Sequence, residues 1–329
     1  MKKKIIAILL IAIMLIALAA CAANNEPTPP AQTEPPTEAT ANGGDEVAPP
    51  PAQVIDEDRE GNPITLPETI TTVISMGPAT TEILSALGFA DKIIAVDTFS
   101  DNIAGIDPSI AILDMMAPDG ERIIALQPDV LFVAGISRYG ADDPFRLIAD
   151  AGICVIFIPS STSIAGIQED IRFIAAVMDN APGGEQLIEN MNREIDAVRQ
   201  VSATITERRT VYFEVSPAPW MVSFGSDTFL NEMIEIIGAE NVFAAEEGWM
   251  SVSDEIIVVT NPDVILTSVD FIDNPVGEIL SRPGWDAITA VQNGDVFYID
   301  TDASNRPSHN IVLALFEMAM VVYPDYFGG

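Results

Sequence analysis

Two glutamates occupy equivalent places in two similar segments of the chain. Residues 121–132 resemble residues 255–266, and each segment begins with a glutamate, Glu121 or Glu255, seven residues before a Pro-Asp pair. A glutamate in the first turn of a helix interacts favourably with the helix dipole and needs no other partner. Either residue alone is therefore explained by local structure, but the matched pair favours a function that both carboxylates share.

A second pair of similar segments occurs in the same order along the chain. Thr-Glu-Ile-Leu-Ser-Ala-Leu-Gly at 81–88 resembles Asn-Glu-Met-Ile-Glu-Ile-Ile-Gly at 231–238. In stacked-repeat proteins the repeat recurs about every 20 to 50 residues, whereas these two segments are much farther apart in the sequence. The pattern predicts two lobes built on one plan, with a cleft between them.

Short apolar runs alternate with amphipathic stretches over the whole folded region. This pattern predicts an α/β fold of two lobes, with mostly parallel sheets flanked by helices and right-handed crossovers. A long amphipathic pattern predicts one connecting helix at 182–207, between an N-terminal lobe at 54–181 and a C-terminal lobe at 208–329. The predicted strands are 73–76, 93–96, 130–133, 154–158, 211–215, 264–266 and 296–299.

The first 53 residues carry two signals of export and attachment. Residues 1–20 have a lysine-rich start and a short apolar run, which is typical of a secretory signal peptide. Leu-Ala-Ala-Cys at 18–21 resembles the lipobox of bacterial lipoproteins, which makes Cys21 the predicted lipidated residue. Residues 21–53 are rich in Pro, Thr and Glu and predict a disordered tether.

The charge of the mature chain limits its partners. The chain has 15 basic and 49 acidic residues, and removing residues 1–20 takes away three lysines, so 12 minus 49 leaves −37. This field repels nucleic acid and anionic membrane, so membrane contact is expected through the lipid anchor alone. It also disfavours a highly anionic ligand.

Enzyme motifs are missing from the sequence. There is no GxSxG elbow, P-loop or GxGxxG after a strand, and the one histidine, His309, is expected to be a surface or capping residue at the start of the last helix. One histidine also argues against a bare zinc or manganese site. Cys154 lies in a strand pattern and is expected in the core. We predict that the chain is not an enzyme and has no cofactor.

From residue 72 to 324 the sequence resembles the substrate-binding lipoproteins of ABC importers for iron-siderophore complexes, cobalamin and haem. The resemblance follows the motifs at 73–88 and 121–130, Ala-Gly-Ile-Cys-Val-Ile-Phe-Ile-Pro at 151–159, Asn-Gly-Asp-Val-Phe-Tyr-Ile at 293–299 and Arg-Pro at 306–307. It implies a helix-linked pair of lobes on the outer face of the cell membrane. It also implies that Glu121 and Glu255 dock onto the two subunits of a permease dimer, which works with a cytoplasmic ATPase.

The resemblance also implies which residues contact the ligand, a small-molecule metal chelate. Trp249, Asp302 and Arg306 match cleft residues of cobalamin binders, whereas Met115 stands where those proteins have another tryptophan. Arg306 could alternatively pair only with Asp302. Trp220 and Tyr139 are further candidates because both lie in predicted loops.

A ferric siderophore is the first ligand expected, since siderophore receptors form the largest part of this family. Cobalamin, another corrinoid or haem is the alternative within the same family. An enzyme, or a surface receptor that works without a transporter, remains an alternative function on the same fold.

Overall fold

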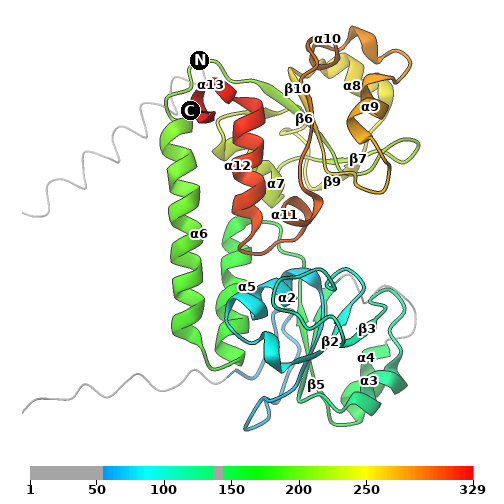
Figure 1. Cartoon of the computed structure of the whole chain (residues 1–329), viewed down its shortest axis with the longest axis vertical. Coiled ribbons are helices and arrows are strands. Elements are labelled where there is room, and N and C mark those ends of the chain that lie inside the picture. Colours follow the sequence, from blue (N-terminus) through cyan, green and yellow to red (C-terminus); the bar gives the residue numbers. More distant parts are fainter. Residues whose placement is uncertain (1–54, 136–143, 329) are drawn as a thin grey trace, which may run out of the picture. The chain divides into compact units, whose positions relative to one another are not determined.

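Strands with apolar residues on both faces form a parallel sheet in each half of the chain. The computed structural model describes residues 55–135 and 144–328 (Figure 1), so residues 1–53, with Cys21 and the predicted tether, lie outside the described residues. The first sheet has the order β3-β2-β1-β4-β5, and every neighbouring pair is parallel. Its strands are β1 (Val73–Met76), β2 (Ile93–Asp97), β3 (Ala111–Leu113), β4 (Val130–Ala134) and β5 (Cys154–Ile158).

The second sheet repeats this plan with fewer strands. It has the order β11-β10-β6-β8, again parallel throughout, and a separate antiparallel pair joins β7 to β9. The strands are β6 (Thr210–Glu214), β7 (Val222–Phe224), β8 (Glu240–Asn241), β9 (Trp249–Ser251), β10 (Val264–Thr267) and β11 (Val296–Tyr298). The α/β fold with mostly parallel sheets is therefore confirmed.

Helices connect the strands in both lobes. The first lobe contains α2 (Pro78–Ala86), η1 (Ala90–Lys92), α3 (Gly120–Leu126), α4 (Pro144–Asp150) and α5 (Ile164–Val177). The second contains α7 (Phe229–Ile236), α8 (Asp254–Thr260), α9 (Pro275–Leu280), η3 (Trp285–Ala287), α10 (Thr289–Asn293), α11 (Thr301–Asn305), α12 (Ile311–Val322) and α13 (Pro324–Phe327). No helix within 55–135 and 144–328 combines the length and apolarity needed to cross a bilayer.

The long helix α6 (Ala181–Ser202) connects the two lobes and packs against α5 and α12 (Figure 1). It ends before the predicted boundary at 207, because Thr204 and Ile205 turn back to hydrogen-bond the carbonyls of Val201 and Ser202. Ile205, which the amphipathic pattern assigned to the helix, packs against the core from this turn instead.

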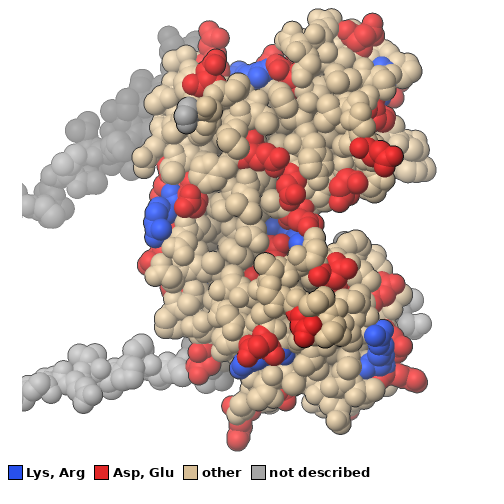
Figure 2. All heavy atoms as spheres, viewed as in Figure 1, with Lys and Arg blue, Asp and Glu red and all other residues tan. Residues whose placement is uncertain are grey.

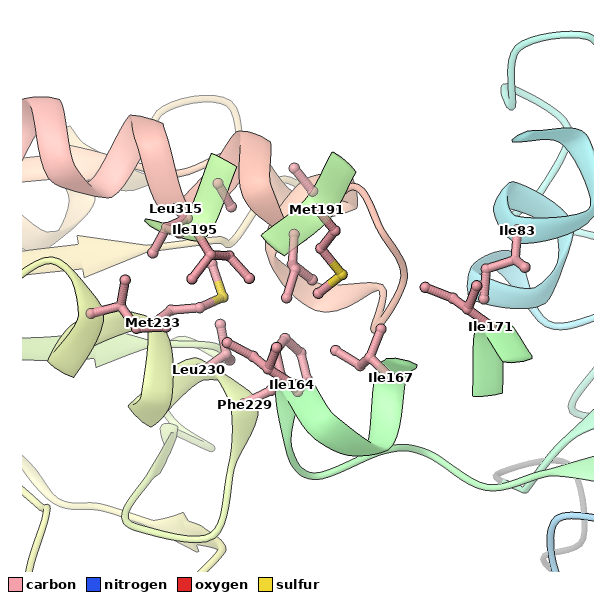
Figure 3. Packing of buried hydrophobic residues seen from close by; sticks show 14 of the residues in the cluster. Ile83, Ile164, Ile167, Ile171, Met191, Ile195, Phe229, Leu230, Met233 and Leu315 are labelled. Atoms are coloured by element: carbon pink, nitrogen blue, oxygen red, sulfur yellow. The ribbon is translucent and has the colours of Figure 1, made fainter. Parts of the chain in front are cut away.

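One apolar core runs through both lobes. Val73 and Phe132 of the first sheet belong to the same buried cluster as Val211 and Leu266 of the second. Figure 3 shows where the helices join it: Ile164 and Ile167 of α5 lie opposite Met191 and Ile195 of α6, whereas Ile171 of α5 lies beside Ile83 of α2. Leu230 and Met233 of α7 belong to the same cluster. Alternate strand residues, such as Ile74 and Ile265, point to a separate core on the opposite face of each sheet.

Candidate functional site

A cavity of about 330 Å³ lies where the first sheet meets the second lobe. Its wall includes residues at or just after the ends of the strands of the first sheet, among them Gly77, Met115, Ala134 and Pro159. The carboxyl ends of parallel strands meet at one edge of a sheet, which is the usual place for a ligand in open α/β folds. The stretch Asn305–Pro307 of the second lobe completes the wall.

Apolar groups dominate the lining of this cavity. Met115 is buried, whereas Met116 and Phe99 are 59% and 56% exposed, so their side chains are available to a ligand. A Cβ at Gly77 would lie 3.0 Å from the Cβ of Ala134, so a glycine lets the ends of β1 and β4 pack closely at this wall. Flexible methionines next to an aromatic ring suit the irregular apolar face of a bulky ligand.

The charged groups of the cavity are neutralised within the protein. Asp170 is 2% exposed, and its Oδ1 forms an ion pair with Nε of Arg59 at 2.7 Å. Its Oδ2 accepts a short hydrogen bond from the hydroxyl of Ser161. Burial raises the pKa of Asp170, and its bonds to Ser161 and Arg59 oppose this effect. Among the described lining residues Arg306 is the only lysine or arginine.

Arg306 is buried and bonded to both lobes. Its Nη1 lies 3.0 Å from Oε1 of Glu82 in α2, and its Nη2 lies 2.6 Å from Oδ1 of Asp302 in α11. Nη2 also donates to the carbonyl of Phe99 at 2.8 Å. Arg306 does pair with Asp302, as the sequence allowed, but the residue is 8% exposed, so this ion pair is not a solvated one.

A second cavity, of about 340 Å³, shares Arg306 with the first. Its lining includes Glu82, Asn102, Asp302 and His309, so it too is formed by both lobes. Asn102 donates to Oδ2 of Asp302 at 2.7 Å across this boundary. Cobalamin-type contacts had been expected at Asp302 and Arg306, and the structure brings both to the boundary between the lobes.

His309 is half-buried and precedes Asn310, the N-cap of α12. Its Nδ1 is buried without a hydrogen-bond partner among the described residues, so the surface or capping position expected from the sequence is wrong. Burial lowers the pKa of His309 to about 4. The imidazole is therefore neutral at physiological pH.

Acidification is expected to destabilise the chain through His309. In the unfolded chain His309 is protonated as the pH falls through 6.5, whereas in the folded chain it is protonated only near pH 4. The contribution of neutral His309 to stability is therefore complete above pH 6.5 and is lost as the pH falls from 6.5 to about 4. Between pH 7 and 5 the free energy of unfolding should fall by about 2 kcal/mol more in the parent than in His309→Leu. Urea unfolding at the two pH values measures this loss of free energy. Equal losses in the parent and in His309→Leu would contradict the prediction.

Glu121 and Glu255 have matching surroundings in the two lobes. Each is the exposed second residue of a seven-residue helix, α3 or α8. Both helices end in a left-handed residue, Gln127 at φ 50° and Asn261 at φ 46°. A hydrogen bond from Ser253 lowers the pKa of Glu255, which keeps that carboxylate ionised.

The strands that follow these helices are attached in the same way. Oδ2 of Asp129 accepts from the backbone N–H of Thr72 at 2.9 Å, and Oδ2 of Asp263 accepts from that of Thr210 at 2.8 Å. In return, the N–H of each aspartate donates to the carbonyl of the same threonine. The repeat seen in the sequence is thus a repeat of the structure, and it presents one glutamate on each lobe.

The two tryptophans predicted as ligand contacts lie outside the two cavities. Trp249 begins β9, is 52% exposed and packs edge to face on Phe224 at 5.8 Å between ring centroids. Trp220 is 80% exposed in the loop before β7. Neither residue lines the cavity that contains Met115 or the one that contains Asp302, and Tyr139 lies outside the described residues.

Sequence patterns did not identify three residues that line the cavities: Glu82, Phe99 and Asn102. Glu82 belongs to the repeated segment 81–88, which we had used for the fold alone, and Phe99 follows a strand end, a position that could have identified it. Burial raises the pKa of Cys154 to about 11, which keeps the thiol protonated at neutral pH. No group of three or more His, Cys, Asp or Glu within 55–135 and 144–328 is arranged to hold a metal ion.

Two similar α/β lobes that share cavities are the architecture expected of a solute-binding protein. The family model for periplasmic binding proteins matches residues 73–303. The chain therefore belongs to the periplasmic binding protein family, and it is a substrate-binding protein of an ABC transporter of the metal-chelate type.

Individual relatives agree with this family. The chain is 30% identical over 276 residues to YvrC of Bacillus subtilis, an uncharacterized ABC transporter substrate-binding lipoprotein, covering 82% of this chain and 86% of the relative. It is 30% identical over 208 residues to the vitamin B12-binding protein of Yersinia pestis, covering 62% and 72%. A possible iron-binding protein from Staphylococcus epidermidis has a similar structure, with a TM-score of 0.71 and 27% identity, covering 78% of this chain and 100% of that chain.

Proposed function

We propose that this chain captures a bulky, weakly charged metal chelate between its lobes and delivers it to an ABC permease. The observation that carries the proposal is the apolar cavity at the strand ends of the first sheet, completed by Asn305–Pro307 of the second lobe. Its one basic lining residue, Arg306, is already paired with Glu82 and Asp302. An anionic ligand therefore finds no free cation on the described wall.

A corrinoid is the first candidate ligand. The methyl groups on its ring edge suit Met115, Met116 and Phe99, its amide side chains carry no charge, and the Yersinia relative is named for vitamin B12. A neutral or cationic ferric hydroxamate is the second candidate, favoured by the iron-binding description of the Staphylococcus structure. The net negative charge disfavours ferric catecholates, which are strongly anionic. Figure 2 shows acidic side chains spread over the face in view, with basic ones in a few small groups.

Attachment and delivery complete the proposal. The lipobox-like sequence that ends at Cys21, together with the name of the Bacillus relative as a lipoprotein, supports a lipid anchor on the outer face of the membrane. Glu121 and Glu255 would each accept a bidentate pair from an arginine of one permease subunit. Two such pairs, one on each lobe, would fix the direction in which the cleft faces the permease.

Ligand titrations of the mature lipoprotein in detergent test the proposal. We expect saturable quenching of tryptophan fluorescence with cyanocobalamin or a ferric hydroxamate, and none with a ferric catecholate. Met116→Asp should weaken binding at least about tenfold, because an unpaired carboxylate against an apolar ligand costs more than about 1.4 kcal/mol. Met320→Asp is the matched control, since Met320 is similarly exposed, at 48% against 59%, but lies on α12 outside both cavities.

The outcomes separate the candidates. Quenching by one chelate identifies its class, and equal weakening by Met116→Asp and Met320→Asp would place the ligand outside the cavity. Trp249→Phe tests whether this tryptophan, predicted as a ligand contact, touches the chelate. If it does, the variant should bind more weakly and show less quenching of tryptophan fluorescence. Binding of the catecholate alone would overturn the proposed ligand class.

A further inference from the structure

One carboxylate of the first lobe is held by two donors of the second lobe. Oε1 of Glu82 pairs with Nη1 of Arg306 at 3.0 Å, and Oε2 of Glu82 accepts a short hydrogen bond from the hydroxyl of Ser308. The side chains of Glu82 and Arg306 are 7% and 10% exposed. These residues are more than two hundred positions apart in the sequence, so only the folded arrangement of the lobes brings them together.

Further bonds hold the same boundary. Nη2 of Arg306 donates to the carbonyl of Phe99 at 2.8 Å and to Oδ1 of Asn102 at 3.3 Å. Nδ2 of Asn102 donates in return to Oδ2 of Asp302 at 2.7 Å. The second lobe thus contacts α2 and the loop after β2 of the first lobe through charged or amide groups, in addition to the apolar core that the lobes share.

We propose that Glu82 and Arg306 form an interlobe clamp that holds the cleft at one width before the ligand arrives. The proposal rests on the proposed function, because the width matters for the cavity that the chelate would enter. Arg306 lines both cavities, and in this role it is a positioning residue. Its guanidinium orients the two walls and leaves recognition of the ligand to Met115, Met116 and Phe99.

The clamp has a physical basis in the burial of its charges. Rotating the lobes apart would separate a buried guanidinium from a buried carboxylate and would leave Ser308 without its acceptor, which is costly where water is scarce. A cavity held in its binding geometry avoids the loss of conformational entropy when the ligand binds. The clamp is therefore expected to favour affinity by preorganisation, with little change of interlobe distance on binding.

Pulsed electron spin resonance on the full mature chain tests the clamp. Spin labels at Ala125→Cys on α3 and Val259→Cys on α8, both exposed positions, report the interlobe distance in a Cys154→Ser background. With the clamp intact we expect one narrow distance distribution, unchanged by cyanocobalamin. Glu82→Gln and Arg306→Met should each broaden the distribution of the unliganded chain, and a ligand that binds should narrow it again.

Matched variants separate the clamp from general damage. Glu82→Gln keeps the shape of the side chain, and Arg306→Lys keeps its charge, so both remain informative if Arg306→Met folds poorly. Glu185→Gln breaks the exposed pair between Arg172 and Glu185 and should leave the distribution narrow. Where a chelate binds, Glu82→Gln should lower its affinity about tenfold while Glu185→Gln leaves it unchanged.

Two results would overturn the clamp. One is a broad distribution in the unliganded parent. The other is a narrow distribution in both Glu82→Gln and Arg306→Met, or in Glu82→Gln by itself if Arg306→Met does not fold. Neither measurement needs a ligand. A failure to bind any tested chelate would therefore count against the proposed function and leave the result on the clamp intact.

Discussion

Replacing Arg282 with methionine is expected to destabilise the folded chain by about 3 to 5 kcal/mol at pH 8, the usual loss when one partner of a buried ion pair is removed. Nη1 and Nη2 of Arg282 lie 2.6 and 2.8 Å from the two carboxylate oxygens of Glu214. Glu214 ends β6 at 1% exposure, and the guanidinium stacks on Trp285 at 4.5 Å. The variant leaves the carboxylate buried without its cation.

The loss should depend on pH in a defined direction. Burial raises the pKa of Glu214, and Arg282 opposes this effect. Without Arg282, Glu214 stays protonated in the folded chain, whereas in the unfolded chain it loses its proton above the ordinary pKa of a glutamate, about 4.5. The free energy of unfolding of the variant therefore falls as the pH rises above about 4.5. Urea unfolding of Arg282→Met should therefore show a smaller loss at pH 5 than at pH 8.

An exposed pair provides the control for this experiment. Arg172 and Glu185 form a 2.8 Å ion pair with side chains 46% and 54% exposed, and such pairs contribute about 0 to 1 kcal/mol. Arg172→Met should therefore change the free energy of unfolding by less than about 1 kcal/mol. A similarly small change in Arg282→Met at pH 8 would show that Glu214 finds another partner or reaches water.

The sequence predicted the elements whose signals are local. β1 and β5 have the predicted bounds, because each is a short apolar run buried on both faces. The predicted start of the connecting helix, residue 182, lies one residue from the observed start of α6 at Ala181. Its amphipathic pattern was recognisable because Ile188, Met191 and Ile195 are buried on one face. The short strands β3, β7, β8 and β9 were missed because two or three residues leave too short a pattern to recognise.

The site could be predicted only where a family motif or a strand end marked it. Met115 and Arg306 line the main cavity, in agreement with their predicted place in the cleft, although contact with a ligand stays a prediction. The neighbouring sequence does not indicate that Arg306 pairs with Glu82 or that Arg282 pairs with Glu214, because the partners in each pair are far apart in the sequence. Such pairs depend on tertiary packing, which spacing along the sequence does not encode.

Replacing both Glu121 and Glu255 with glutamine is expected to abolish stimulation of the permease-linked ATPase and to leave ligand affinity unchanged. Each carboxylate is exposed at the start of its own helix, and a hydrogen bond to a charged partner contributes about 1.5 to 3 kcal/mol. Each single variant should therefore weaken docking about tenfold or more, and the double variant more strongly. ATP hydrolysis by permease and ATPase in proteoliposomes, titrated with the lipoprotein, measures the loss.

The position of the two glutamates makes this effect specific. Glu121 and Glu255 lie outside both cavities and form no ion pair with another described residue, so the variants should leave the fold and the ligand cavity unchanged. Glu189→Gln, at an exposed position of α6, removes the same charge elsewhere and should keep full stimulation. If the double variant stimulates as well as Glu189→Gln, the paired carboxylates act only on their own helix dipoles, and docking takes place through another surface.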